Sequence, residues 1–453
     1  MNLGSFISLL FNNLHEYVIL AFIILITYYV VFHRYIFSVY DPLFFNSFLS
    51  SSFATTTVVF LFLNKKIELV YFANYLITVF CFYFVFYMFG KKIPKESNLK
   101  FRREKKKVCV KNYYYQNDDF GMSFWISFVV FASFNILIQL YFYIKMGIPL
   151  FMDSRLSVQI NGGAIIGLLT RIKHLLDTLS LFMTFFVLCN SDARKRIVAK
   201  LYIIFLFSVS LLSGSKGGLI GYVFIFAVFI FYTQKKNQKW VTRITNPKSI
   251  IVLFIGGLSV LLIIHIQQRG NLLETINHLI LRFAAYGDGY VYAYPNDTIT
   301  KLNNPGFFKF LFGDFLYTFR LLDGRLVGLG FELSNIIYHV NNSVTGPNPR
   351  FNIAGYAYFG FAGSVILALI SGFIFTFGRN ILVSALDDKP SKQVFAYCIS
   401  SLVLSIETDI CQVIVNLTTN LLLQSIFVVV VSFLIIYAKP KKNMNYRLCN
   451  TTL

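Results

Sequence analysis

The sequence predicts an all-α, polytopic integral membrane protein with about 11 transmembrane helices (10–12) and one large external loop. Of its 453 residues, 56% are hydrophobic and only 13% are charged, and the mean hydropathy is +0.64. Soluble domains carry about 25% charged residues, so this chain has too few charges to coat a water-soluble surface. Apolar runs of about 20 residues, the length that crosses a bilayer, also recur along the whole chain. These observations argue against a soluble enzyme, a disordered chain and a DNA-binding protein, although the formal net charge is +21.

The predicted spans begin near the N-terminus and continue almost to the C-terminus. Their boundaries follow from the apolar runs and are good to a few residues. The last two are the least regular, because Glu407, Thr408 and Asp409 sit at their junction. The eleven segments are 17–32, 43–63, 69–89, 123–144, 170–189, 197–213, 217–233, 249–266, 352–377, 393–408 and 411–437.

The Lys and Arg residues give the orientation, since short cytoplasmic loops of membrane proteins are enriched in them. One set of loops holds 27 of the 41 basic residues. We therefore assign this set to the cytoplasm, which places the C-terminus inside and, with eleven spans, the N-terminus outside. Most of the positive charge is thus a topology signal, and no nucleic acid is expected as a partner.

Two loops stand out in what we expect to be a single transmembrane domain covering 1–453. The cytoplasmic loop 90–122 is rich in Lys and Arg, typical of a segment that touches anionic lipid headgroups. The external loop 267–351 contains two amphipathic segments, 272–283 and 307–322, which we expect to be helices lying in the membrane interface.

Several kinds of chemistry have no support in the chain. The six cysteines show no CxxC spacing and no pairing pattern with histidine, so neither a disulfide framework nor a metal site is expected. The glycine-rich turn around Lys216 lacks the spacing of a phosphate-binding loop. We expect no cofactor and no metal.

Cationic residues on the predicted external side oppose the orientation rule and so require another explanation. Lys216 lies in a tight turn between two short spans and is flanked by glycines. Arg171, His174 and Asp177 are spaced three apart, which places them on one face of a helix. Charged groups at bilayer depth usually face a cavity or a partner, and arginine suits phosphate recognition. An anionic lipid such as a polyprenyl pyrophosphate would account for the cluster, although snorkelling anchors and surface ion pairs explain individual members equally well.

Three stretches resemble the Wzy family of O-antigen and capsule repeat-unit polymerases. The first is G-I-P-L-F at 147–151, followed by Arg155, which resembles a motif that opens an external loop in many members. The others are S-G-S-K-G-G at 213–218 and I-A-G-Y-A-Y-F-G-F-A-G at 353–363, the second of which begins the span after the large loop. The likeness rests on the combination of these motifs with the topology.

Departures from the family limit what can be carried over. Many members have a Glu near the F-G-x-x-G stretch where Ala354 stands here. The related O-antigen ligases place a His eleven residues before the first of the paired glycines. That position is Pro349 here, and the nearest histidine is His339. The pattern therefore favours a polymerase over a ligase.

The resemblance implies a metal-independent membrane glycosyltransferase at the outer face of the bacterial cytoplasmic (inner) membrane. It would polymerise undecaprenyl-pyrophosphate-linked oligosaccharide repeat units into O-antigen or capsular polysaccharide, as part of lipopolysaccharide or capsule biosynthesis. Its partners would be the lipid-linked donor and acceptor and membrane lipids, with a chain-length regulator and a flippase as further partners. The runner-up functions are a lipid-linked oligosaccharide flippase or transporter, and an O-antigen ligase.

Such a reaction needs cations for the departing pyrophosphate and a base for the acceptor hydroxyl. Asp288, Asp323 and His339 could supply the base. The candidate catalytic residues are Arg282, Lys216, Asp288 and His339. The candidate residues for binding pyrophosphate or glycan are Arg155, Arg171, Arg269, Arg320, Arg325 and Arg350.

Overall fold

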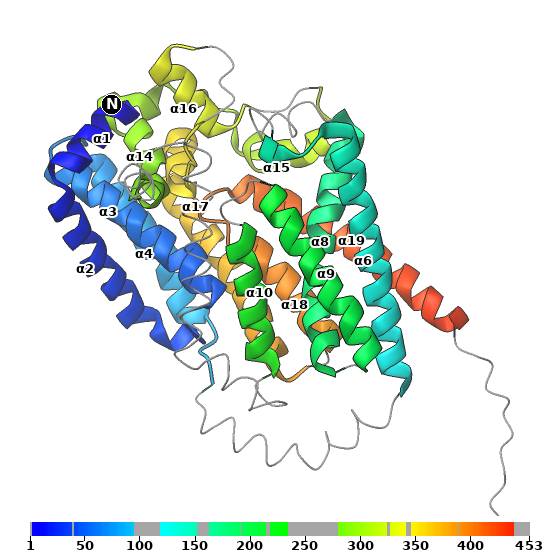
Figure 1. The fold of residues 1–453 in the computed structure, drawn as a ribbon. Helices are drawn as coiled ribbons and strands as arrows, with labels where there is room; N and C mark the ends of the chain where they lie inside the picture. Colours follow the sequence, from blue (N-terminus) through cyan, green and yellow to red (C-terminus); the bar gives the residue numbers. More distant parts are fainter. Residues whose placement is uncertain are drawn as a thin grey trace, which may run out of the picture.

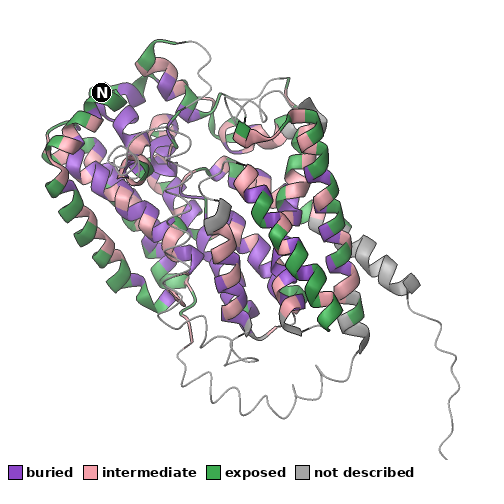
Figure 2. Ribbon diagram, in the orientation of Figure 1, coloured by how far each residue is buried: buried purple, intermediate pink, exposed green. Residues whose placement is uncertain are grey.

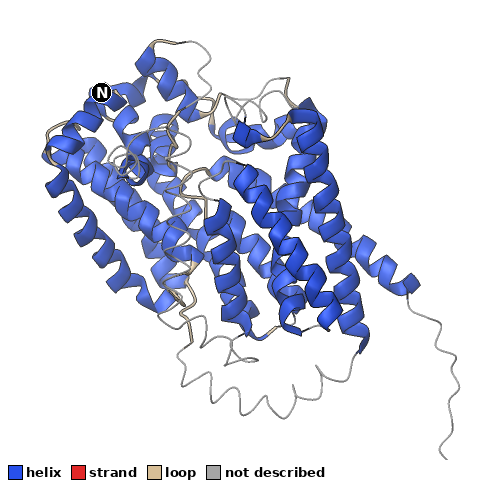
Figure 3. Cartoon of the chain, viewed as in Figure 1, coloured by secondary structure: helices blue, strands red, loops and turns tan. Residues whose placement is uncertain are grey.

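The computed structural model describes most of the chain, and every regular element in the described residues is a helix (Figure 3). Over this part of the chain the fold class is therefore all-α, as predicted. The described residues are 2–38, 40–94, 118–151, 163–190, 192–213, 218–233, 280–323, 327–340, 346–388 and 390–438.

The N-terminal helices form one half of the bundle (Figure 1). Their aromatic and aliphatic side chains pack with those of α14 and α16 in a shared core. The sequence patterns did not predict the first of these helices. The elements are α1 (Leu3–Asn12), α2 (Leu14–Phe32), η1 (His33–Tyr35), η2 (Phe44–Leu49), α3 (Ser50–Leu63) and α4 (Leu69–Phe89).

The middle of the chain forms the other half, in which α8 packs against α6, α9, α10 and α18. Its core is again made of aromatic and aliphatic side chains. The elements are α6 (Asp118–Met146), η3 (Pro149–Phe151), α8 (Gly163–Asn190), α9 (Ala193–Leu212) and α10 (Gly218–Thr233).

Short helices cover one end of the bundle, which we call the α14 end (Figure 1). They come from the segment that the sequence predicts as a large external loop. The predicted amphipathic helix 307–322 corresponds to α15, which ends at Thr318, whereas most of 272–283 lies outside the described residues. The elements are η5 (Ala285–Gly287), α14 (Asp288–Ala293), η6 (Pro295–Lys301), α15 (Phe307–Thr318) and α16 (Leu329–Tyr338).

The helix α17 (Phe351–Ser384) joins the two halves and is broken at Gly360. Gly360 has φ of 67° and ψ of −169°, a conformation that residues with a Cβ rarely adopt. The break folds the first piece back on the second, so that a Cβ on Gly355 would stand 2.7 Å from the Cα of Ser364. As a result, residue 350 is carried into the bundle. Then follow η7 (Ala385–Asp387), α18 (Pro390–Val403) and α19 (Ile410–Ala438).

The outer surfaces of several helices are apolar, which is the reverse of a water-soluble helix. On α2, Ile19, Phe22, Ile26 and Val30 follow one face and are each more than half exposed. Polar residues such as Ser50, by contrast, are buried. Figure 2 shows the exposed residues along the outer helices and the buried ones towards the inside of the bundle. An apolar rim around a partly polar interior fits a helix bundle in lipid.

Five helices in the described residues are long and apolar enough to cross a membrane: Leu14–Tyr35, Phe44–Leu63, Leu69–Phe89, Phe124–Phe151 and Phe351–Ser384. Each corresponds to one of the eleven predicted spans. Helices also occupy five further predicted positions, 170–189, 197–213, 217–233, 393–408 and 411–437, while 249–266 lies outside the described residues. The segment 393–408 differs from the prediction, because α18 ends at Val403 and a turn follows.

The two ends of the bundle differ in their short elements and in their basic residues. The end opposite the α14 end holds η1, η7 and the start of α18, and we call it the η7 end (Figure 1). Arg34, Lys91 and Arg379 lie at this end, as do Lys195 and Lys392. These are residues that the orientation rule assigns to the cytoplasm.

Candidate functional site

A buried ion pair between Arg350 and Glu407 lies where the folded-back start of α17 meets the turn after α18. The Nη1 atom of Arg350 lies 2.9 Å from Oε2 of Glu407, and both side chains are only 4% exposed. The backbone N–H of Phe351 also donates to the carbonyl oxygen of Glu407, at 3.1 Å. The pair therefore ties two segments that are far apart in the sequence.

Hydroxyl groups form further hydrogen bonds with both members of the Arg350–Glu407 pair. Arg350 donates through Nη1 to the Ser51 hydroxyl at 3.0 Å and through Nη2 to the Ser50 hydroxyl. Glu407 accepts from the Tyr83 hydroxyl at 2.6 Å and from the Ser51 hydroxyl. Burying two charges is costly unless the geometry is good and the remaining donors and acceptors are satisfied. The small serines at the start of α3 leave room for the guanidinium and meet this requirement.

Arg350 reaches the α14 end through its third nitrogen. Its Nε donates to the backbone carbonyl of Tyr286, at 3.2 Å, two residues before Asp288. The backbone N–H of Asn348, in turn, faces Oδ1 of Asp288 at 3.3 Å. The segment 346–350 is thus held between the ion pair on one side and the start of α14 on the other.

Glycines allow this segment to pass close to α14 and α16. A Cβ on Gly289 would stand 2.8 Å from the carbonyl oxygen of Asn348, and one on Gly330 would stand 2.0 Å from that of Pro347. Any larger residue at either position would displace the backbone that contacts Asp288. The close approach is therefore built into the sequence at these glycines.

Asp288 is the titratable group of this arrangement. Its burial raises the pKa to about 7, while hydrogen bonds from the backbone N–H groups of Asn348 and Gly289 and the positive charge of Arg350 oppose the rise. The side chain remains half-buried rather than sealed. A carboxyl group with these properties can accept a proton near neutral pH.

Tyrosines surround the same region. The Tyr290 hydroxyl donates to Oδ1 of Asn352 at 2.7 Å, and the hydroxyls of Tyr292 and Tyr338 lie 3.0 Å apart. Tyr286 is 38% exposed, and its ring stacks on that of Phe53 with the centroids 6.4 Å apart. Such faces can stack on sugar rings, and they also serve as packing between short helices.

The structure brings together two of the residues predicted from sequence, Asp288 and Arg350. Three others, Arg282, Arg320 and His339, lie exposed at the α14 end, as does Asp323. His339 ends α16 in a left-handed conformation, with φ of 52°. Among the described residues, none of Arg282, Arg320 and His339 forms an ion pair with Asp288.

The remaining predicted residues fall elsewhere. Arg171 lies on α8, in the other half of the bundle, near the ion pair in which Lys173 Nζ stands 2.5 Å from Oδ2 of Asp177. The residues Arg155, Lys216, Arg269 and Arg325 lie outside the described residues.

The sequence patterns did not predict Glu407 as part of a site. Its only signal was an acidic residue within a segment assigned as a membrane span, which is costly unless the residue has a partner. That partner, Arg350, is 57 residues away, so its identity depends on the fold.

Comparison of the chain with protein-family models, with curated proteins and with solved structures found no match. Over the described residues, the fold and the apolar outer surface define an all-α architecture with helices of membrane-spanning length. No group of three or more His, Cys, Asp or Glu side chains that could hold a metal ion occurs in the described residues.

Proposed function

We propose that this protein is an integral-membrane glycosyltransferase that polymerises undecaprenyl-pyrophosphate-linked oligosaccharide repeat units into O-antigen or capsular polysaccharide. The observation that carries the proposal is Asp288, a half-buried carboxyl group with a pKa raised to about 7. A base works best when its pKa lies near the working pH. The resemblance to the Wzy polymerases supplies the substrate class.

The reaction joins the acceptor hydroxyl oxygen to the anomeric carbon of the donor glycan. The bond from that carbon to the pyrophosphate breaks, and the pyrophosphate leaves with the electron pair. The acceptor proton passes to the Asp288 carboxylate. Arg350 is enclosed by its partners and positions the segment beside Asp288, so it does not itself face the substrate.

Cations must stabilise the charge that develops on the leaving pyrophosphate. Arg282 and Arg320 are exposed at the same end of the bundle as Asp288 and supply such charge. Lys216 and the arginines at 155, 269 and 325 are further candidates from the sequence. We place the reaction on the outer face of the inner membrane, with the C-terminus in the cytoplasm, on the distribution of basic residues alone.

A lipid-linked oligosaccharide transporter is the second candidate, because broken helices and buried charges are typical of transporters. The break in α17 at Gly360 and the Arg350–Glu407 pair are both features of this kind. An O-antigen ligase would use the same lipid-linked donor.

Deletion of the gene, followed by complementation, tests the proposal. A deleted host should carry surface glycan that stops at one repeat unit, and the wild-type gene should restore long chains. Asp288→Asn should restore at most about one-hundredth of the polymerisation rate, because it removes the base but keeps a hydrogen-bond acceptor. The readout is the ladder of glycan lengths on a gel, at matched protein levels in the membrane.

The control variant is Asp192→Asn, which changes an exposed carboxylate at the η7 end and should restore the full ladder. A normal ladder in the deleted host would rule out a polymerase. Total loss of capped acceptor would favour a flippase or a ligase. Long chains with Asp288→Asn would show that Asp288 is not the base.

A further inference from the structure

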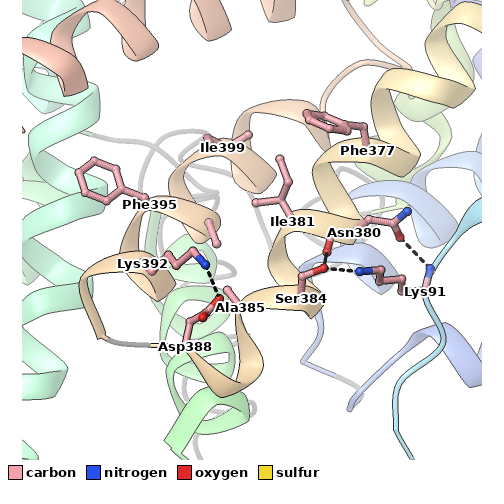
Figure 4. A pocket seen from close by; sticks show the side chains of 11 residues that line it. Lys91, Phe377, Asn380, Ile381, Ser384, Ala385, Asp388, Lys392, Phe395 and Ile399 are labelled. Carbon is pink, nitrogen blue, oxygen red and sulfur yellow. Dashed lines mark hydrogen bonds and ion pairs between the residues drawn. The ribbon is translucent and has the colours of Figure 1, made fainter.

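A groove at the η7 end lies between the end of α17 and the start of α18, far from Asp288 along the bundle. It is open to the surface and has a volume of about 550 Å³. Figure 4 shows apolar side chains along its upper part and polar and charged ones along its lower edge. The proposed glycosyl transfer makes no use of it.

The apolar part is made by the same spacing on both helices. Phe377 and Ile381 are four residues apart on α17, as are Phe395 and Ile399 on α18, so each pair lies on one helix face. Phe377 is 66% exposed, and Phe373, one turn earlier on the same face, is 52% exposed. This row of side chains leads from the apolar outer surface of the bundle into the groove.

The polar edge contains two lysines that the fold holds in place. The backbone N–H of Lys91 donates to Oδ1 of Asn380 at 2.7 Å, and its Nζ donates to the Ser384 hydroxyl at 2.6 Å. Lys392 lies on α18, and its Nζ stands 3.1 Å from Oδ2 of Asp388. Lys91 and Lys392 thus reach the groove from opposite sides (Figure 4).

The charges along this edge do not cancel. Two ammonium groups face one carboxylate, that of Asp388, among the described residues that line the groove. A single phosphodiester group would make the edge neutral, whereas a headgroup that also carries a cation would not. Basic pockets beside membrane helices at the cytoplasmic side commonly bind anionic headgroups in this way.

We propose that this groove binds one acidic phospholipid, with its phosphate between Lys91 and Lys392 and an acyl chain along Phe377 and Ile381. The apolar row that continues onto the outer surface favours a lipid over a soluble phosphate, which would leave this row uncovered. The proposal does not depend on the glycosyltransferase assignment, since the groove lies at the other end of the bundle.

Native mass spectrometry of the full-length protein tests the proposal with two lipids, phosphatidylglycerol and phosphatidylcholine, offered at equal concentration. The wild type should retain phosphatidylglycerol preferentially. Lys91→Gln and Lys392→Gln should each weaken its retention about fivefold, since each removes one ammonium group beside the phosphate. Asp388→Asn should strengthen it, because it removes the opposing carboxylate.

Lys66→Gln is the matched control, an exposed lysine at the α14 end, and should leave retention unchanged. The lysine variants are expected to keep the wild-type unfolding temperature, because both side chains are exposed. Equal retention of the two lipids would overturn the proposal, as would wild-type retention in the Lys91→Gln/Lys392→Gln double variant. Displacement of phosphatidylglycerol by inorganic phosphate at equal concentration would also overturn it, in favour of a site for free phosphate.

Discussion

The part of the chain that the structure describes contains two buried arginine–carboxylate pairs, Arg350–Glu407 towards the α14 end and Arg379–Asp41 at the η7 end. Arg379 binds Asp41 through two nitrogens, with Nη1 3.0 Å from Oδ1 and Nη2 2.5 Å from Oδ2, and it also donates to the carbonyl of Tyr35. Asp41 in turn accepts from two backbone N–H groups. Arg350 instead divides its donors among a carboxylate, two hydroxyls and a carbonyl.

The two ion pairs differ in the segment of the chain that each one fixes. The Arg379–Asp41 pair closes the chain reversal between α2 and α3, and its two side chains are at most 1% exposed. The Arg350–Glu407 pair is also enclosed, but it fixes the segment that contacts Asp288, a half-buried group with a pKa near neutrality. A buried ion pair is therefore not itself a site, because its guanidinium and carboxylate are already bound to each other. Acid–base catalysis requires a neighbouring group that can still exchange a proton.

The largest effect is expected from Arg379→Met. This change leaves the Asp41 carboxylate buried without its cation and should lower the free energy of unfolding by about 3–5 kcal/mol. Chemical denaturation in detergent micelles measures the loss. The control is Asp192→Asn, which breaks an exposed ion pair with Lys195 and should cost about 0.5 kcal/mol or less. A similar small loss in Arg379→Met would show that the η7-end pair does not stabilise the fold.

A smaller loss of stability is expected from Glu407→Gln, about 2 kcal/mol, because the Ser50 and Ser51 hydroxyls still accept from Arg350.

The Glu407→Gln variant should also change the protonation of Asp288, since Arg350 then carries an uncompensated positive charge near it. That charge favours the carboxylate and should lower the pKa of Asp288. The midpoint of the pH–activity curve should move down in Glu407→Gln and stay in place in Arg379→Met. An unchanged midpoint in both variants would remove the distinction between the two pairs.

The smallest effect concerns the pH dependence of the wild type. As a base, Asp288 must be ionised, so the polymerisation rate should rise about tenfold between pH 6 and pH 8, around a pKa of about 7.

The stability of the wild-type protein should change in the opposite direction. The folded state raises the pKa of Asp288 above its ordinary value of 3.8. The stability that the protonated Asp288 contributes to the folded state is therefore complete below about pH 4 and is lost as the pH rises through 7. Rate measurements between pH 6 and pH 8 test the first trend, and denaturation between about pH 4 and pH 7 tests the second. Asp288→Asn should show neither trend. A flat rate profile in the wild type would contradict the role of Asp288.

Much of the helical framework could be predicted from apolar segments alone. Within the described residues, helices occupy the ten predicted span positions that this part of the chain covers, because a run of apolar residues has to bury its backbone polar groups in hydrogen bonds within the segment. The patterns did not predict α1, which is only ten residues long, and they extended the segment 393–408 through the turn after Val403. Short helices and turns depend on contacts with other segments, which hydropathy does not encode.

The candidate site could be predicted only in part. Asp288 and Arg350 were recognised as charged residues in an otherwise apolar chain, but so were Arg282, Arg320 and His339, which lie exposed. Residue type alone does not separate an enclosed arginine from an exposed one. The break at Gly360 makes that distinction, because it carries Arg350 inward to meet Ser50 and Glu407.

The sequence by itself determined the class of fold, since low charge and repeated apolar runs allow little besides a bundle of helices in lipid. It also determined which residues carry charge, and thus the predicted orientation. Only the tertiary structure decided which of those charges are paired, buried or able to titrate. The reason is physical, because the pKa of Asp288 and the partners of Arg350 depend on desolvation and on groups brought close by folding from distant parts of the chain.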